Sequence, residues 1–217
     1  PFVVTGRHMK AANLIALQAD NLHGGRLATG HLLALGHRRI AYVAGYAHHP
    51  DASDRLAGHR RALAAADVAF DPSLVVPGEF TEPSGRDATL ALLERGTPFD
   101  AIVAANDQMA IGAMLALHRR GLRVPADVSV VGYDDIAAAA YTIPPLTTVR
   151  QSGYEAGTLS AVAMLRLLGG ERGAPDWPAP QIVLRESTSA PSRGPDGRGS
   201  DPHQPSLPGS PLNGPVS

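Results

Sequence analysis

The stretch AIVAANDQMAIGAMLALHRRGLRVPADVSVVG, residues 101–132, decides the fold class of this 217-residue chain. It opens with an apolar run at 101–104 that does not alternate with polar residues, which predicts a strand buried on both faces. An amphipathic pattern over 107–120 predicts a helix, and Gly121 supplies its stop signal. A second apolar run at 128–132 predicts the next strand. Strand, helix and strand in this order are typical of a parallel sheet.

The same alternation continues toward both ends of the chain. Further strands are expected at 2–5, 39–44, 74–76 and 181–185, and further helices at 24–35, 54–66, 84–96 (with Ser84 as its N-terminal cap) and 154–168. Residues 146–149 are expected to form an extended crossover. Buried strands that each lead into an amphipathic helix require helices on both faces of one sheet, so the expected fold class is α/β.

Composition and charge narrow the class of protein. The chain has 19 basic and 20 acidic residues, and Lys10 is its one lysine. Proteins that bind nucleic acid usually present a basic face to the phosphates, so these residues are not expected to form a DNA-binding surface. No apolar run approaches the roughly 20 residues of a membrane helix, and residues 1–20 do not resemble a signal peptide. Cysteine is absent, which fits a reducing cytoplasm.

Polar residues follow the carboxyl ends of the expected strands, and in an open parallel sheet these ends share one edge, where ligands bind. An arginine, several carboxylates, an amide and an aromatic ring are expected together at this edge. Such a set suits a sugar, which needs polar partners for its hydroxyls and a flat apolar surface for its C–H face. A nucleobase or another polyfunctional small molecule could use the same set. The residues are Asp51, Arg55, Phe80, Asn106, Asp107, Asp134 and Asp135.

Most of these residues also have a plain structural interpretation. Asp107 stands where a helix N-cap belongs, and capping is favoured over ligand contact. One of Asp134 and Asp135 is expected only to form a turn, with Asp134 the one that reaches the ligand. Arg55 taken alone is more often a surface ion pair. Phe80 either packs its loop or stacks on the ligand, and Asn106 either braces its loop or contacts the ligand.

Catalytic and metal-binding interpretations have little support in the sequence. The chain has no GxGxxG, GxxxxGK[ST], HExxH or GxSxG pattern. The local motifs of dinucleotide binding, P-loop phosphate binding, zincin metalloproteases and hydrolase nucleophile elbows are therefore absent. The adjacent pair His48-His49 is interpreted as a solvated loop rather than a metal site. Gly24-Gly25 is interpreted as a plain helix start rather than an anion cradle. We therefore expect no catalytic residue, no metal and no cofactor.

Five motifs occur in a fixed order over nearly all of residues 1–190. They are Asp20-Asn21 and Gly24-Gly25 leading into HLLALGHRRIA (31–41), RLAG (55–58), ANDQMAIG (105–112), VPADVSVVGYDD (124–135) and PLTTVRQ (145–151). The ending LREST (184–188) follows them. Together these motifs resemble the lactose-repressor (LacI/GalR) family of transcriptional regulators.

This resemblance implies a periplasmic-binding-protein-like clamshell of two doubly wound subdomains, with an effector between them. Residues 21–148 and 177–188 would form the complete C-terminal, effector-binding subdomain. Residues 1–20 and 149–176 would be the remnant of the N-terminal subdomain. Residues 187–217 contain 7 Pro, 5 Gly and 7 Ser, so 189–217 are expected to form a disordered tail.

The resemblance also assigns roles to individual residues. It implies effector contacts from Asp51, Arg55, Phe80, Asn106 and Asp134. A contact from the other subdomain would fall at Gly6 or Arg7, where relatives often carry an acidic residue. Near Gly153 the resemblance implies an aromatic or polar contact that a glycine cannot make.

The expected function is that of the effector-sensing region, most simply for a sugar, of a cytoplasmic and homodimeric repressor. That protein would bind operator DNA through a helix-turn-helix headpiece outside this chain. The alternatives are a periplasmic sugar-binding protein of a transporter and an enzyme acting on sugars.

Overall fold

The computed structural model describes residues 1–6, 9–11, 13–151, 153–171 and 173–192. The elements are, in chain order, β1 (Phe2–Thr5), β2 (Leu14–Leu17), α1 (Asn21–Ala34), β3 (Ile40–Ala44), α2 (Pro50–Ala65), the 3-10 helix η1 (Pro72–Leu74), β4 (Val75–Pro77), α3 (Glu82–Arg95), β5 (Ala101–Ala104), α4 (Asp107–Arg119), β6 (Ser129–Asp134), the 3-10 helix η2 (Ala137–Tyr141), β7 (Thr147–Arg150), α5 (Gly153–Leu168) and β8 (Gln181–Val183). The expected alternation of strands and helices, and the α/β class, are confirmed.

The main sheet has six strands in the order β4-β3-β5-β6-β7-β8. All neighbours are parallel except β8, which runs antiparallel to β7. The chain steps from β3 outward to β4 and then back across β3 to β5, so the winding reverses between β3 and β5. Right-handed crossovers therefore put α2 on one face of the sheet and α3 and α4 on the other, and α1 packs against α2. Ligands of doubly wound sheets bind at such a switch point, beyond the carboxyl ends of the strands.

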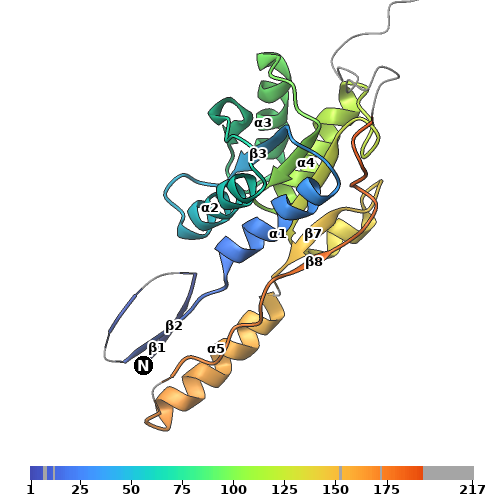
Figure 1. Cartoon of the computed structure of the whole chain (residues 1–217). Helices are drawn as coiled ribbons and strands as arrows, with labels where there is room; N and C mark the ends of the chain where they lie inside the picture. Colours follow the sequence, from blue (N-terminus) through green and yellow to red (C-terminus); the bar gives the residue numbers. More distant parts are fainter. Residues whose placement is uncertain (7–8, 12, 152, 172, 193–217) are drawn as a thin grey trace, which may run out of the picture.

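The described residues have two hydrophobic clusters. The larger one fills the main sheet and its helices, and the strands β3, β5 and β6 are buried along nearly their whole length. The smaller one joins β1 and β2, which pair in parallel, to α5 through Ile15, Leu17 and Ala163. Figure 1 shows β1, β2 and α5 side by side below the main sheet, and we call this group the small lobe.

Three connections link the main sheet to the small lobe. They run from β2 to α1, from β7 to α5 and from α5 to β8. All three meet the main sheet at the carboxyl ends of its parallel strands, as Figure 1 shows. The junction between the two groups of elements is therefore on the edge where the sequence predicts a binding site.

Helices α1 and α2 approach each other unusually closely because glycines stand at their crossing. A Cβ atom on Gly25 would lie 2.2 Å from the carbonyl oxygen of Arg55, and one on Gly58 would lie 2.2 Å from that of Leu22. Glycine therefore allows the two backbones to touch. This contact brings the first turn of α1 against the side chain of Arg55.

The starts of α1, α2 and α3 differ from the sequence expectation, and α1 begins at Asn21 rather than at residue 24. Thr81, rather than Ser84, is the N-cap of α3, and Ser84 is the reciprocal partner in a capping box. Helix α2 begins at Pro50, which suits the first turn because proline has no N–H to leave unpaired. Asp51 therefore lies on the first turn of α2 and not in a loop.

Two strand assignments also differ. The extended crossover expected at 146–149 is the strand β7, which pairs with β6 over Val131–Thr147 to Asp134–Arg150. Strand β2, with the sequence LIAL, was not expected at all. It is stabilised by pairing with β1 and by burial of Ile15 and Leu17 against α5 rather than by any local signal.

The segment after β8 runs along the main sheet instead of leaving it. The Ser187 hydroxyl donates to the carbonyl oxygen of Val130 and accepts from the Thr147 N–H. The Ser189 N–H donates to Ser129 Oγ. Disorder was expected from residue 189 onward, so for 189–192 that expectation is wrong. Residues 193–217 of the expected tail lie outside the described residues.

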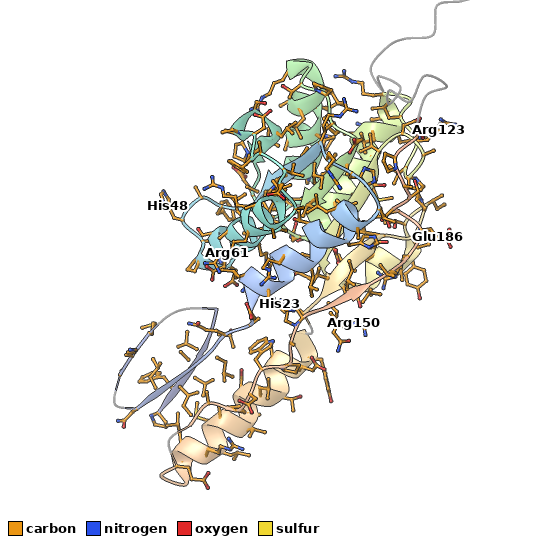
Figure 2. All side chains as sticks on the ribbon, viewed as in Figure 1. His23, His48, Arg61, Arg123, Arg150 and Glu186 are labelled. Atoms are coloured by element: carbon orange, nitrogen blue, oxygen red, sulfur yellow. The ribbon has the colours of Figure 1, made fainter. Side chains whose placement is uncertain are left out.

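Among the described residues, no helix has the length and apolar character needed to span a membrane. In the same part of the chain, no three His, Asp or Glu side chains gather as metal ligands would. His48 lies exposed on the loop before α2 (Figure 2).

Candidate binding site

Arg55 on α2 is the centre of the polar residues at the carboxyl edge of the sheet. Its side chain is buried, with 5% of the residue exposed. Its Nε donates to Asn21 Oδ1 at 2.8 Å, and its Nη1 donates to the carbonyl oxygen of Ala105 at 2.6 Å. Its Nη2 lies 3.3 Å from Asp134 Oδ1. One guanidinium therefore fixes the start of α1, the end of β5 and the end of β6 relative to α2.

The ring of Tyr133 completes the environment of this guanidinium. The Arg55 Cζ atom lies 3.7 Å from the ring centroid, which is a close cation–π contact. Gly24 leaves room for the ring, since a Cβ there would lie 2.1 Å from the tyrosine hydroxyl. Burial raises the pKa of Tyr133 to about 12, so the hydroxyl stays protonated. Arg55 is thus held from four sides and is preorganised.

Asp134 presents its carboxylate at the end of β6. It has a φ of +105°, and Asp135 follows with a φ of +57°, so the chain turns sharply here in a backbone region that non-glycine residues seldom adopt. About a third of the Asp134 side chain is exposed. Burial raises the pKa of Asp134 to about 6 in spite of Arg55, and the negative charge of Asp51 acts in the same direction. The carboxylate of Asp51 is thus near enough to Asp134 for its charge to be felt there.

Asn106 connects two loops of the same edge. Its Oδ1 accepts from the Met109 N–H at 2.9 Å, which makes it the N-cap of α4. Its Nδ2 donates to the carbonyl oxygen of Phe80 at 3.0 Å. The expectation that Asp107 caps this helix is wrong, because the extended backbone that a cap requires occurs at Asn106.

Phe80 packs within its own loop region. The ring sits directly over Gly45, where a Cβ atom would lie 2.1 Å from the ring Cζ. Tyr46 and His49 meet it edge-on, with ring centroids at 5.7 and 5.6 Å. The residue itself has a φ of +59°. These contacts show that Phe80 packs its own loop, which is one of the two roles that the sequence allows; the other is stacking on a ligand.

Asp107, the first residue of α4, braces this edge from inside. Its Oδ1 accepts from the Thr148 hydroxyl at 2.6 Å, and its Oδ2 accepts from the Ile136 N–H at 2.9 Å. Burial raises the pKa of Asp107 to about 7, although the hydrogen bond from Thr148 opposes the rise. The carboxyl group thus joins α4 to β7 and to the turn after β6.

Asp135 makes a second brace beside Asp134. Its carboxylate accepts from Arg150 Nε at 2.7 Å and from Arg185 Nη2 at 2.5 Å. Arg150 lies where the main sheet meets the small lobe, as Figure 2 shows. The sequence expectation that one aspartate of this pair has a structural role fits these ion pairs.

A cavity of about 230 Å³ lies at the junction of the main sheet and the small lobe. Asp51 lines it, and Asp134 lines a neighbouring hollow that shares Gln151 and Gly153 with it. Arg7, the residue expected to reach the ligand from the other subdomain, lies outside the described residues. The cavity is lined by Thr5, Gly6, Ala19, Asn21, His49, Asp51, Gln151, Gly153, Ala156 and Trp177.

The site includes residues that the sequence did not single out. Asn21 belongs to a quoted motif, but its bond to Arg55 depends on the α1–α2 crossing. Tyr133 lies on β6, and no local pattern in the sequence indicates its contact with Arg55. Gln151 and Trp177 enter the cavity from the connections around α5.

The chain resembles known proteins in sequence and in structure. Residues 29–188 match the family described as the periplasmic binding protein-like domain. The HTH-type transcriptional regulator AscG of Escherichia coli (strain K12) is 38% identical over 194 residues, which are 89% of this chain and 58% of AscG. The chain thus spans somewhat more than half the length of that relative.

Two solved structures extend the comparison. A sugar-binding transcriptional regulator of the LacI family from Escherichia coli, complexed with phosphate, is 37% identical with a TM-score of 0.81, covering 87% of this chain and 68% of that one. A LacI family transcriptional regulator from Enterococcus faecium with bound ribose is 31% identical with a TM-score of 0.79, covering 88% and 71%. These relatives are regulators, which favours that class over a transporter's binding protein. The chain therefore belongs to the LacI/GalR family of transcriptional regulators, and its fold is the periplasmic-binding-protein-like fold of that family.

Proposed function

We propose that this chain is the effector-sensing region of a DNA-binding transcriptional regulator and that its effector is a sugar. The observation that carries the proposal is the environment of Arg55. A buried guanidinium held by Asn21, Ala105 and Tyr133 is oriented before any ligand arrives, and its fourth contact, Asp134, is partly open to solvent. Preorganised polar groups of this kind lower the cost of ordering the site on binding.

The chemistry of the edge supports a polyhydroxylated ligand. The carboxylates of Asp51 and Asp134 can accept hydrogen bonds from hydroxyl groups, and Asn21 and Gln151 add amides at the same junction. The proposed effector-binding residues are Asp51, Arg55, Phe80, Asn106 and Asp134, together with Arg7. Asn106 and Phe80 contribute chiefly by fixing the loops, given the contacts of their side chains.

The proposed division of the chain follows its two hydrophobic clusters except at two boundaries, where Val149 packs in the larger cluster and Trp177 packs against the smaller one. Residues 21–148 and 177–188 would form the effector-binding subdomain, and residues 1–20 and 149–176 would belong to the other one. Effector binding would change how the two approach each other and so how a dimer presents its DNA-binding parts. The region itself would catalyse no reaction, and the regulator would work in the cytoplasm.

A thermal-shift screen with pentoses and hexoses tests the proposal. A sugar that binds the folded chain must raise its melting temperature in a concentration-dependent way. Arg55→Met should abolish the shift, while the exposed Arg61→Met on the same helix should preserve it. If no sugar shifts the wild-type chain, the proposed effector class is wrong.

A gel-shift experiment tests the second part of the proposal. The 217 residues carry a net charge of −1, so this chain alone should not retard an operator fragment in the presence of competitor DNA. Sequence-specific retardation by this chain would contradict the assignment of DNA contact to other residues.

A further inference from the structure

Trp177 is the one tryptophan of the chain and lies on the connection between α5 and β8. One part of its side chain packs against the cluster of Ile15, Leu17 and Ala163 in the small lobe. It also lines the cavity at the junction of the small lobe and the main sheet, and it is neither fully buried nor fully exposed. The ring is therefore anchored on the small lobe and lines the same cavity as Asp51, which reaches it from α2.

The cavity walls have two different characters. Asp51 on α2 and Asn21 on α1 supply polar groups. Gln151 adds an amide whose Oε1 is buried with no hydrogen-bond partner among the described residues. Trp177 and Ala156 supply apolar surface. An unpartnered buried amide oxygen next to such a space favours a ligand that brings a hydrogen-bond donor.

Phe80 does not supply the apolar surface of this cavity. Its ring is fixed over Gly45 between Tyr46 and His49, and the residues that line the cavity include Trp177 but not Phe80. The aromatic ring available to a ligand here thus comes from the connection to β8 and not from the loop after β4.

We propose that Trp177 is an effector-binding residue on which the ring of the ligand stacks, with the ligand's hydroxyl edge turned toward Asp51 and Gln151. A furanose or pyranose has this form, since its C–H face is apolar and its rim carries hydroxyls. The cavity beside Trp177 has a volume of about 230 Å³, below the roughly 300–1,000 Å³ of sites for drug-sized ligands, so we assign one sugar ring to this part of the junction. This inference rests on the proposed function and deepens it.

Tryptophan fluorescence reads out the contact directly, because all tryptophan emission comes from Trp177. We would titrate the chain with D-ribose, D-glucose, D-galactose and cellobiose, following emission and acrylamide quenching, and would record melting temperatures on the same samples. A monosaccharide that raises the melting temperature should also shift the emission maximum to shorter wavelength and reduce quenching.

Two substitutions separate stacking from packing. Trp177→Leu keeps apolar contact with the small lobe but removes the flat ring, and it should weaken binding of the active sugar roughly three- to tenfold. Trp177→Phe keeps a ring and should recover most of the affinity. As a control for fluorescence, Tyr141→Trp in the Trp177→Phe chain puts an emitter on a residue that is 85% exposed, and its emission should not respond.

The outcomes distinguish this inference from the proposed function. If a sugar raises the melting temperature but leaves Trp177 emission, quenching and the affinity of Trp177→Leu unchanged, the stacking role is wrong and the sensor assignment stands. If only cellobiose binds, the one-ring site is wrong. If no sugar binds, the sensor assignment fails and the role of Trp177 fails with it.

Discussion

The guanidinium of Arg55 and the carboxylate of Asp134 lie 3.3 Å apart, although one residue is on α2 and the other ends β6. The parallel sheet produces this proximity, because β3 and β6 deliver their following residues to the same edge. Asp134 is the more exposed of the two, at 33% of its side chain against 6% for Arg55. The arginine is therefore a fixed support, and the aspartate is the member that can exchange partners with a ligand.

Replacing Arg55 by lysine should destabilise the chain and abolish effector binding. An ammonium group lacks the planar fork that contacts Asn21, Ala105 and Asp134 together, so buried acceptors lose their donors. Breaking a buried pair costs about 3–5 kcal/mol, and we expect the low end because Asp134 is partly exposed. The free energy of unfolding from urea titrations measures the cost.

The matched control is Arg61→Lys, which changes an exposed arginine on the same helix (Figure 2). It should alter the free energy of unfolding by no more than about 0.5 kcal/mol. Equal effects of the two substitutions would show that Arg55 has no special role in the fold.

Sugar affinity should depend on pH through Asp134. Burial raises the pKa of this carboxyl to about 6, so its ionised form, which accepts hydrogen bonds from hydroxyls, becomes populated as pH rises from 5 to 7. Calorimetric titrations should therefore give tighter binding at pH 7 than at pH 5. Asp134→Asn should bind more weakly at pH 7 and show a flatter profile, and a profile identical to wild type would exclude Asp134 as the titrating contact.

The order of elements could be predicted from the sequence because the main-sheet strands carry their own signal. Runs such as Ala101–Ala104 are short, apolar and followed by helical periodicity, so burial on both faces is evident locally. The proximity of Arg55 and Asp134 could also be predicted, because residues that follow parallel strands meet at one edge of the sheet. Strand β2 carried no comparable signal, since its four residues gain stability only from β1 and α5.

Other features depend on the backbone path and on tertiary contacts, which local sequence patterns do not determine. Asn106 and Asp107 are adjacent and both suit an N-cap, and only the backbone path selects Asn106 and leaves Asp107 to brace Thr148. The composition after residue 187 is that of a flexible tail, yet Ser187 and Ser189 find specific partners on β6 and β7. The cavity position of Trp177 depends on how the small lobe meets the main sheet, which no local pattern encodes.

Asp107 should make stability fall as pH rises toward 7. Its pKa is raised from 3.8 to about 7, so between these values the folded chain holds a proton that the unfolded chain has released. The free energy of unfolding therefore decreases with rising pH through this window and levels off above about pH 7. Urea titrations between pH 6.5 and 8 measure the effect, and Asp107→Asn should flatten the curve in this range.

The choice of pH range matters because other groups titrate below it. His59 is buried and its pKa is lowered to about 4, so it makes stability rise with pH between about 4 and 6.5. Asp134, with a pKa of about 6, acts in the same direction as Asp107 but only below that value. A wild-type curve that is already flat between pH 6.5 and 7 would contradict the assignment to Asp107.

Two glycines of α1 offer a sharp test of the helix crossing that positions Arg55. Gly25→Ala puts a methyl group 2.2 Å from the Arg55 carbonyl oxygen, so α1 and α2 must separate. We expect a loss of about 2–3 kcal/mol in the free energy of unfolding, as for other overpacked cores. Sugar affinity should fall as well, because Asn21 then moves away from the guanidinium.

Gly30→Ala on the same helix meets no atom within 4 Å and should stabilise the helix by about 0.5–1 kcal/mol without changing affinity. If Gly25→Ala is tolerated as well as Gly30→Ala, the close crossing of α1 and α2 is not what holds Arg55 in place.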